Sequence, residues 1–544
     1  MSKVAHYLQE HVMGEVMTSA DARQYFATDG SIFYVAPAVV LYPRNENDVR
    51  KTARFAWQLA ERGRIIPITP RGSGTDQSGA AIGSGIVMVF PAHMNRILEL
   101  DTKTGVIEVE PGINYGKMQQ TLETHGRFLP PSPANLEYST IGGAVANNTS
   151  GEKSLKYGDT RTYVKSLRVV LANGEVIETR RLNKRELNRK LGLATFEGEI
   201  YRAVDALVEE NQKVIARTEL NVTKNTAGYD LLDVKTKEGF DLTPLIVGSQ
   251  GTLGIVTEVT LETEQHNPHT TLLAGFFDDI GKAQQAILEL RAMPTLPSAI
   301  EMVDGNLLET VKNINPNQLK GIVPTPLPKV VLLVEFDDFG EHSQKKLSKI
   351  AQKILKKFAN NLEEAVSEQD KERLWKIRHS VVTIMSQSDS GLKAVPIIED
   401  GVVPVAAYGE YLTKLEQLLQ HHHVQVAVWG HAGDANLHVR PLLNLAQVGD
   451  RQKAIRLMEE YYNLVIGLGG TTSGEHGDGR LRAPFLPKLY GEEAYGLMLK
   501  VKQIFDPYSI LNPGVKVNVS MDDIKLLMRQ EYSLGVWYGH MPRS

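Results

Sequence analysis

Four ionisable residues lie in glycine-rich stretches near the end of the sequence. "WGHAGDANLH" carries His431 and His438, and "SGEHGDG" carries Glu475 next to His476. Strand-like segments flank residues 433–436, so a hairpin could bring the two histidines together. Two histidines and one carboxylate form a ligand set that catalytic Zn²⁺ and non-haem iron use, with one position open for substrate. The alternative is that each side chain caps a turn or binds water.

His476 adds a group that could transfer protons. A histidine titrates near neutrality and suits removal of an alcohol proton. Neighbouring side chains in an irregular loop usually point in different directions, so Glu475 could bind a metal while His476 acts as a base. The alternative is an ordinary surface histidine.

Three stretches of the first half are rich in glycine, and the first of them is "PRGSGTDQSGAAIGSG", residues 70–85. It lies between two predicted strands, not between a strand and a helix, which argues against a Rossmann fingerprint, and it lacks the Gly-Lys-Ser/Thr of a Walker loop. A wide turn would explain it alone. Residues 130–160 and 247–259 are similar stretches beside strands. Together they predict a groove lined by backbone, suited to a diphosphate and fused rings.

Composition limits the classes of function. The chain has 544 residues, no cysteine and a formal net charge of −4. This length predicts two or more domains, and the charge gives no overall positive field, so we expect no nucleic-acid partner. Without cysteine the chain holds no disulfide and no thiolate-bound iron–sulfur cluster. The N-terminus has no apolar signal segment, and no apolar run approaches the ~18 residues of a membrane span. We expect a cytoplasmic protein and leave peripheral membrane contact open.

The order of predicted elements is α+β. Short strands and helices are expected up to residue 263, including a hairpin at residues 165–179 with a type I′ turn at Asn173-Gly174 and a helix at 196–217. The polar stretch "EQHNPHT" marks a domain boundary. From about residue 270 a second α+β pattern begins, and its predicted helices are at 280–293, 345–358, 363–379 and 451–467.

The three glycine-rich stretches together resemble the flavin-binding domain of the vanillyl-alcohol oxidase and p-cresol methylhydroxylase superfamily. "FDPYSILNPGVKV", residues 505–517, is similar to that family's C-terminal return to the flavin domain. The resemblance implies an N-terminal helical segment at 1–31 and a two-subdomain FAD-binding domain of the p-cresol methylhydroxylase type at 32–265. An α+β substrate domain with the metal site would follow at 266–500, and a segment packing on the FAD domain at 501–544.

The resemblance also implies which residues bind FAD. They are Pro70, Arg71, Gly72, Ser73, Gly74, Thr75, Gly79, Pro131, Ser132, Thr140, Gly142, Gly143, Ala144, Asn147, Asn148, Ser150, Gly151, Gly251, Gly254, Ile255, Val256 and Asn512. Some family members attach FAD covalently through His or Cys. Residues 70–85 contain no histidine and the chain contains no cysteine, so we expect non-covalent FAD.

The stretches around His431 and Glu475 resemble the D-2-hydroxyacid dehydrogenase branch of this superfamily, which includes D-lactate and D-2-hydroxyglutarate dehydrogenases. The resemblance implies that His431, His438 and Glu475 bind a divalent metal, Zn²⁺ or Mn²⁺, and that His476 is the general base. It implies oxidation of a small D-2-hydroxy acid to the 2-oxo acid, with hydride transfer to flavin N5.

The resemblance further places Arg378 and Lys393 at the substrate carboxylate, for which arginine is a natural bidentate partner. Surface charges would be the alternative. The sequence departs from the family at Val382, where a threonine is expected, although Thr383 is adjacent.

Arg440 suggests a second carboxylate contact. It follows His438 by two residues, and on a strand that spacing returns to the same face. A cation there suits D-2-hydroxyglutarate or D-malate. The alternative is that Arg440 pairs with a nearby Asp or Glu.

Reduced FAD would need an external electron acceptor: a quinone, a cytochrome, an electron-transfer flavoprotein or another subunit. A homodimer is left open. Two other functions are retained. One is a non-redox transferase similar to alkyl-dihydroxyacetone-phosphate synthase, although that branch has a His-rich loop where this chain has Glu475. The other is a catalytically inactive flavoprotein subunit.

Overall fold

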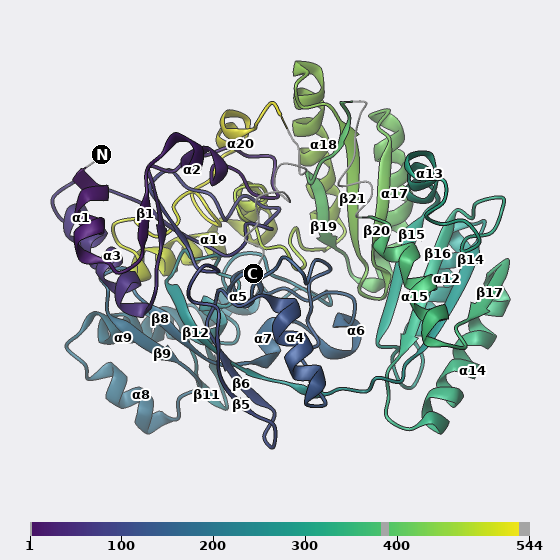
Figure 1. Ribbon diagram of the computed structural model, residues 1–544, viewed down its shortest axis with the longest axis horizontal. Coiled ribbons are helices and arrows are strands. Elements are labelled where there is room, and N and C mark those ends of the chain that lie inside the picture. Colours follow the sequence, from purple (N-terminus) through teal and green to yellow (C-terminus); the bar gives the residue numbers. More distant parts are fainter. Residues whose placement is uncertain (1–2, 382–390, 532–544) are drawn as a thin grey trace.

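The computed structural model describes residues 3–381 and 391–531. Three larger sheets organise the chain, and Figure 1 shows the third sheet on the right and the first two on the left. The first sheet has the order β1-β2-β4-β3, in which β2 and β3 both run parallel to β4. Its strands are β1 (Glu15–Met17), β2 (Val39–Tyr42), β3 (Ile68–Arg71) and β4 (Ile86–Val89).

Helix α3 (Glu46–Ala60) packs on the first sheet. Its apolar residues Val49, Ala53 and Ala56 recur at helical spacing and are buried, and Asn45 caps its first turn by accepting a bond from the Asp48 N–H. Figure 1 shows α1 (Lys3–His11) beside α3, and α2 (Ala20–Tyr25) follows β1. The N-terminal segment, expected to be helical, therefore also supplies an edge strand.

The second sheet is antiparallel, with the order β5-β6-β12-β8-β9. Its strands are β5 (Ile97–Asp101), β6 (Val106–Val109), β8 (Val164–Val170), β9 (Val176–Thr179) and β12 (Ile255–Glu262). The helices that share its core include α4 (Tyr115–Thr124), α5 (Ile141–Asn147), α9 (Phe196–Glu210), α10 (Gln212–Ala216) and α19 (Leu486–Phe505).

Two local predictions in this region were wrong. A type I′ turn needs positive φ at both central residues, but only Gly174 has it, at 84°. Asn173 instead accepts a bond from the Glu175 N–H through its side chain, a local turn contact that needs no left-handed backbone. The helix expected at 196–217 is interrupted at Asn211, whose side-chain amide donates to the Leu207 carbonyl and ends α9.

The third sheet has the order β17-β14-β16-β15-β20-β21-β18, and β19 also pairs with β21. Its strands are β14 (Thr271–Phe277), β15 (Ala299–Asp304), β16 (Val330–Phe336), β17 (Asn361–Glu364), β18 (Lys393–Ala394), β19 (Ile398–Val402), β20 (Val426–His431) and β21 (Asn436–Leu443). The predicted hairpin around residues 433–436 is confirmed, because β20 and β21 pair antiparallel with Trp429 opposite His438.

Helices cover both faces of the third sheet. One face packs on α12 (Ile280–Arg291), α14 (Glu341–Phe358), α17 (Tyr408–His421) and α18 (Val448–Gly467). The other face packs on α13 (Gly305–Ile314) and α15 (Glu368–His379). Helix α15 begins five residues later than predicted, because Ser367 caps it and the preceding residues form β17.

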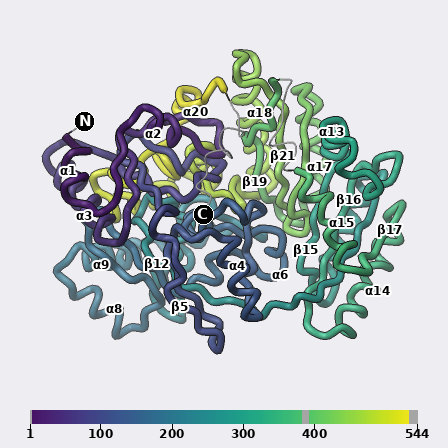
Figure 2. The backbone as a smooth tube through the Cα atoms, in the orientation of Figure 1, coloured from purple at the N-terminus to yellow at the C-terminus, as the bar shows by residue number. Residues whose placement is uncertain are grey.

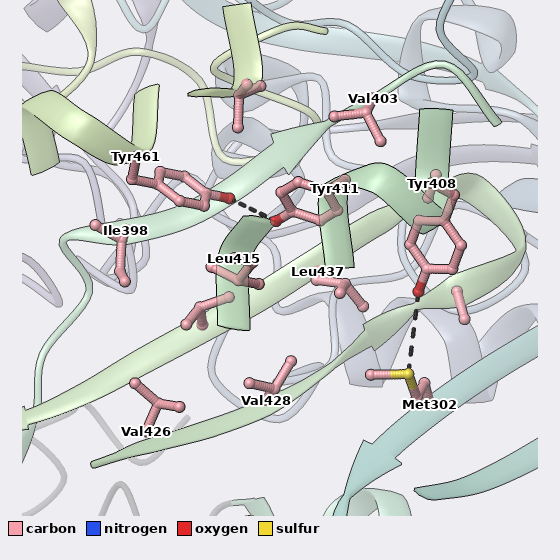
Figure 3. Close-up of a cluster of buried hydrophobic side chains, with 14 of the residues drawn as sticks. Met302, Ile398, Val403, Tyr408, Tyr411, Leu415, Val426, Val428, Leu437 and Tyr461 are labelled. Carbon is pink, nitrogen blue, oxygen red and sulfur yellow. Dashed lines mark hydrogen bonds between the residues drawn. The ribbon is translucent and has the colours of Figure 1, made fainter. Parts of the chain in front are cut away.

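The first of these faces is a filled core (Figure 3). The hydroxyls of Tyr411 and Tyr461 lie 3.0 Å apart, and the Tyr408 hydroxyl lies 4.0 Å from the Met302 sulfur. Met302 and Leu437 point into this core, so the adjacent strand residues Glu301 and His438 point to the opposite face. A packed core thus fixes the strands that carry the polar residues described below.

The end of the described chain returns to its beginning. Figure 2 shows the yellow C-terminal segment, which includes α20 (Met521–Leu527), beside the purple N-terminal segment. Phe33 bridges to Met528, and Ile68 bridges to Leu511 in the first sheet. The predicted domain boundaries stay predictions; α19 already packs in the core of the second sheet from Leu486 onward. In the described part of the chain, no helix combines the length and apolarity that crossing a bilayer requires.

Candidate active site

A single cavity joins the glycine-rich loops to the histidine stretches. Its volume is about 1730 Å³, including space open to solvent. The predicted FAD residues that line it are Pro70, Arg71, Gly72, Ser73, Gly74, Thr75, Thr140, Gly142, Gly143, Ala144, Asn147, Gly251, Gly254 and Val256. The other predicted residues that line it are Arg378, His431, His438, Arg440, Glu475 and His476. The structure therefore places many of the predicted FAD-binding residues around the same cavity as most of the predicted metal-binding, substrate-binding and catalytic residues.

The glycine-rich loops approach each other too closely for side chains. A Cβ on Gly251, whose φ is +71°, would lie 2.3 Å from Pro70 Cγ. A Cβ on Gly72 would lie 2.3 Å from the Thr140 hydroxyl, which itself caps α5 by accepting the Gly143 N–H. Glycine is therefore required where the three loops meet.

Several predicted FAD residues do not line the cavity. They are Gly79, Pro131, Ser132, Asn148, Ser150, Gly151, Ile255 and Asn512, none of which is among the described residues that line the cavity. The Asn512 amide donates to the carbonyls of Ala80 and Gln250, both at 2.8 Å, and so ties two loops together. Asn148 donates to Asp159 at 2.7 Å.

His431, His438 and Glu475 converge on one point. Glu475 Oε1 lies 2.9 Å from His431 Nε2 and 3.2 Å from His438 Nε2, and all three side chains are buried. The opposite nitrogens face other carboxylates: His431 Nδ1 is 2.7 Å from Glu301 Oε1, and His438 Nδ1 is 3.4 Å from Glu399 Oε2. Metal-binding histidines in proteins are commonly oriented by carboxylates in this way. The donor set and its surroundings fit a divalent cation.

The second oxygen of Glu475 is fully engaged. Oε2 accepts bonds from the Ser150 hydroxyl at 2.5 Å, the Gly151 N–H at 2.7 Å and the Lys224 ammonium at 3.2 Å. Burial would raise the pKa of Glu475, but His431 and Lys224 hold it well below its ordinary value. Glu475 is therefore ionised, with only Oε1 directed at the imidazoles.

His476 is held by Glu399. Its Nδ1 lies 2.9 Å from both Glu399 oxygens, while its Nε2 is 3.8 Å from Glu475 Oε1. Burial would lower the pKa of His476, but the Glu399 carboxylate raises it to about 9. Glu399, His438 and His476 also lie close enough to form a second ligand set. Glu399, however, already pairs with the Arg482 guanidinium at 3.0 Å, which suits an orienting role better than a ligand role.

Two buried arginines face the cavity. Arg378 Nε donates to Glu301 Oε2 at 2.7 Å, and its Nη1 has no hydrogen-bond partner among the described residues. Arg440 Nη2 donates to Gln77 and lies 3.6 Å from Glu399, while its Nε and Nη1 have no such partner in the described chain. Both side chains are 1% exposed. Unpaired guanidinium N–H groups in a buried position suit an anionic ligand.

Lys393 is placed differently. It lies in β18 opposite Leu443 and is half-buried, but the described residues that line the cavity do not include it. Val382 and Thr383, where the sequence departs from the family, lie outside the described residues.

Sequence reasoning missed the carboxylates and cations that support this site. Glu301 stands in the otherwise apolar "SAIEMV", and Glu399 with Asp400 follows the apolar "VPII". An acidic residue inside a buried strand is a signal that could have identified both glutamates. Lys224 and Arg482 lie in polar loops, where no such signal exists.

Comparisons with known proteins identify two family domains in the chain. The family model for an FAD binding domain matches residues 37–180, and the model for the C-terminal domain of FAD linked oxidases matches residues 266–515. D-2-hydroxyglutarate dehydrogenase of Escherichia coli (strain K12) is 31% identical over 93% of this chain and 50% of that protein. The chain thus spans about half the length of that relative. The glycolate oxidase subunit GlcD of Bacillus subtilis (strain 168) is 30% identical over 88% of both chains.

The fold has solved counterparts. The structure of p-cresol methylhydroxylase with substrate bound superposes with a TM-score of 0.69 at 14% identity, covering 96% of this chain and 97% of that one. This confirms the predicted fold class, an FAD-binding domain of this type joined to an α+β second domain. The glycolate oxidase subunit is similar over most of both chains, and both family models occur in order along the sequence. The chain belongs to the family of FAD-linked oxidases.

Proposed function

We propose that this protein oxidises a D-2-hydroxy acid to the 2-oxo acid, using non-covalent FAD, a divalent cation and His476 as the base. The observation that carries the proposal is the shared cavity, in which glycine-rich loops face a buried cluster of histidine, glutamate and arginine. The similar proteins named D-2-hydroxyglutarate dehydrogenase and glycolate oxidase subunit are named for 2-hydroxy acids, which supports this substrate class.

When bound, FAD would accept the hydride from the substrate Cα, and the cation would polarise the substrate hydroxyl. His476 takes the hydroxyl proton on Nε2, because Nδ1 is committed to Glu399. Burial lowers the pKa of His476 and the Glu399 carboxylate raises it, and the resulting pKa is about 9. A cation held by the neighbouring His431, His438 and Glu475 would favour the neutral imidazole that a base requires.

We propose that FAD is held without a covalent bond. The loop at residues 70–85 contains no histidine, and the chain contains no cysteine. Acid precipitation should leave the yellow colour in the supernatant, and colour retained in the pellet would contradict the proposal.

We propose that His431, His438 and Glu475 hold one Zn²⁺ or Mn²⁺. Elemental analysis of the purified protein should give one metal per chain, and His438→Ala should lose it. Full activity after exhaustive chelation would exclude a catalytic metal.

For substrate binding, we propose that the carboxylate contacts Arg378, whose Nη1 is available, and that Lys393 is a second contact. Arg440 would bind a distal carboxylate, as in D-2-hydroxyglutarate or D-malate. Its contacts with Gln77 and Glu399 leave two nitrogens for such a group. With D-lactate this part of the cavity would hold water instead.

We propose that reduced FAD passes electrons to an external acceptor: a quinone, a cytochrome, an electron-transfer flavoprotein or another subunit. With no cysteine, this chain cannot hold an iron–sulfur cluster by thiolates. A cytoplasmic location, peripheral membrane contact and a homodimer belong to the same proposal.

The deciding experiment is anaerobic mixing of the FAD-loaded protein with D- and L-2-hydroxy acids while the flavin absorbance is followed. We expect bleaching with D-2-hydroxy acids alone. A non-redox transferase would show no net bleaching with any of them, and an inactive subunit would bind without bleaching.

A further inference from the structure

Glu301 contacts both the cation site and the substrate site. It lies in β15, its side chain is 0% exposed, and its two oxygens have different partners. Oε1 is 2.7 Å from His431 Nδ1, and Oε2 is 2.7 Å from Arg378 Nε. Among the described residues, no other carboxylate contacts both Arg378 and one of the two histidines next to Glu475.

Burying a carboxylate costs free energy unless each oxygen has a partner. The partners of Glu301 therefore indicate its role. The neighbouring residues of β15, Ile300 and Met302, pack into the core on the opposite face. An apolar side chain at position 301 would satisfy the packing of the sheet. The presence of a glutamate at this position is explained by its contacts with His431 and Arg378.

Each contact fixes one functional atom. With Nδ1 of His431 donating to Glu301, the ring must present Nε2 to Glu475 Oε1, 2.9 Å away. With Nε of Arg378 bound to the other oxygen, the guanidinium is held by one edge, and its unpartnered Nη1 stays available to the cavity.

We propose that Glu301 is a positioning residue that couples the cation site to the carboxylate clamp. This inference rests on the proposed function. It requires that one substitution at position 301 weakens cation binding and substrate binding together, although residue 301 touches neither ligand.

The test uses Glu301→Gln in the FAD-loaded, chelator-treated protein. The neutral amide removes the negative charge that strengthens both contacts and places an NH₂ group against one of the two donors, so one contact is lost and the other is weakened. We expect the dissociation constant for Mn²⁺ or Zn²⁺ alone, measured by calorimetry, to rise by about 10- to 100-fold, the usual effect of removing a carboxylate behind a metal-bound histidine. We also expect KM for the D-2-hydroxy acid to rise by about tenfold, the scale of one charge-assisted hydrogen bond.

Glu335→Gln is the matched control. Glu335 is a buried glutamate on the adjacent strand, in register with Ala299, but it pairs with Lys153 at 3.1 Å and with Ser298. Its substitution should lower the melting temperature as much as Glu301→Gln does, with cation affinity and KM unchanged.

Wild-type cation affinity in Glu301→Gln, or equal loss of affinity in both variants, would overturn the inference. If the wild-type protein itself binds no cation, the proposed function fails first and the inference fails with it. Should Glu301→Gln not fold, Glu301→Asp keeps the charge but is one methylene shorter, so it cannot reach both partners. It should fold and still lose cation affinity by several-fold, and unchanged affinity there would equally reject the coupling.

Discussion

The two ends of the cavity are built in different ways. The end formed by the glycine-rich loops presents mainly backbone, and close contacts such as Gly251 against Pro70 shape it. The opposite end consists of ionisable side chains from β15, β19, β20, β21 and α15, each in contact with another ionisable group. Loop conformation therefore governs the first end, and pairing of charges governs the second. Substitutions should affect the two ends separately.

The largest effect is expected at His476. His476→Gln should keep FAD, fold and bound cation but slow flavin reduction by about 10²-fold or more, the usual contribution of a general base. Rapid-mixing spectroscopy under anaerobic conditions measures this rate. A rate near that of the wild type would remove His476 from the mechanism.

Arg440 tests whether the charged end selects the substrate. Arg440→Ala should reduce kcat/KM for D-2-hydroxyglutarate by about 2–3 kcal/mol, the scale of a charged hydrogen bond, and change D-lactate little. Steady-state kinetics with both substrates makes D-lactate the internal control. Equal losses on both would show that Arg440 serves Glu399 and Gln77 rather than a distal carboxylate.

Gly251 tests the backbone end. A left-handed φ costs an ordinary residue about 1–2 kcal/mol, and the added Cβ of Gly251→Ala would meet Pro70. FAD affinity of the apoprotein, measured by fluorescence titration, should fall about tenfold, with cation affinity unchanged. Gly63→Ala is the control, because Gly63 has a similar φ of +77° and open space around it. Loss of cation binding in Gly251→Ala would mean that the two ends are not separable.

The smallest effect concerns Asp304, a half-buried carboxylate that has no cationic partner among the described residues. Asp304 caps α13 and accepts bonds from the N–H groups of Leu307 and Val428, and burial raises its pKa to about 7. The folded state then binds this proton more tightly than the unfolded state, so ionisation of Asp304 lowers stability as pH rises from about 4 to 7.

Asp304→Asn keeps the accepting oxygen and cannot ionise. The difference between the melting temperatures of Asp304→Asn and the wild type should therefore shift in favour of the variant as pH rises from 5 to 8. Differential scanning fluorimetry measures both temperatures. Asp279→Asn, at the exposed cap of α12, should follow the wild-type slope. A parallel slope in Asp304→Asn would mean that position 304 does not titrate in this range.

The backbone end was largely predictable from the sequence, since glycine-rich stretches are local signals, and residues 70–75 do line the cavity. The shared face of His438 and Arg440 also followed from strand periodicity, and both residues line the cavity. The pairings of the charged end were not predictable. Glu301 and Arg378 are 77 residues apart, and Lys224 and Glu475 are 251 apart. Only the completed fold brings such residues together.

The three donors on Glu475 Oε2 have a consequence for biogenesis. Ser150, Gly151 and Lys224 precede Glu475 by 325, 324 and 251 residues, so early chain segments orient a group that is synthesised late. A nascent chain that has not reached Glu475 offers only the two histidines of β20 and β21. We therefore expect cation capture to be the final step of maturation, after the last third of the polypeptide has docked. The partly made protein would then compete poorly for cellular metal.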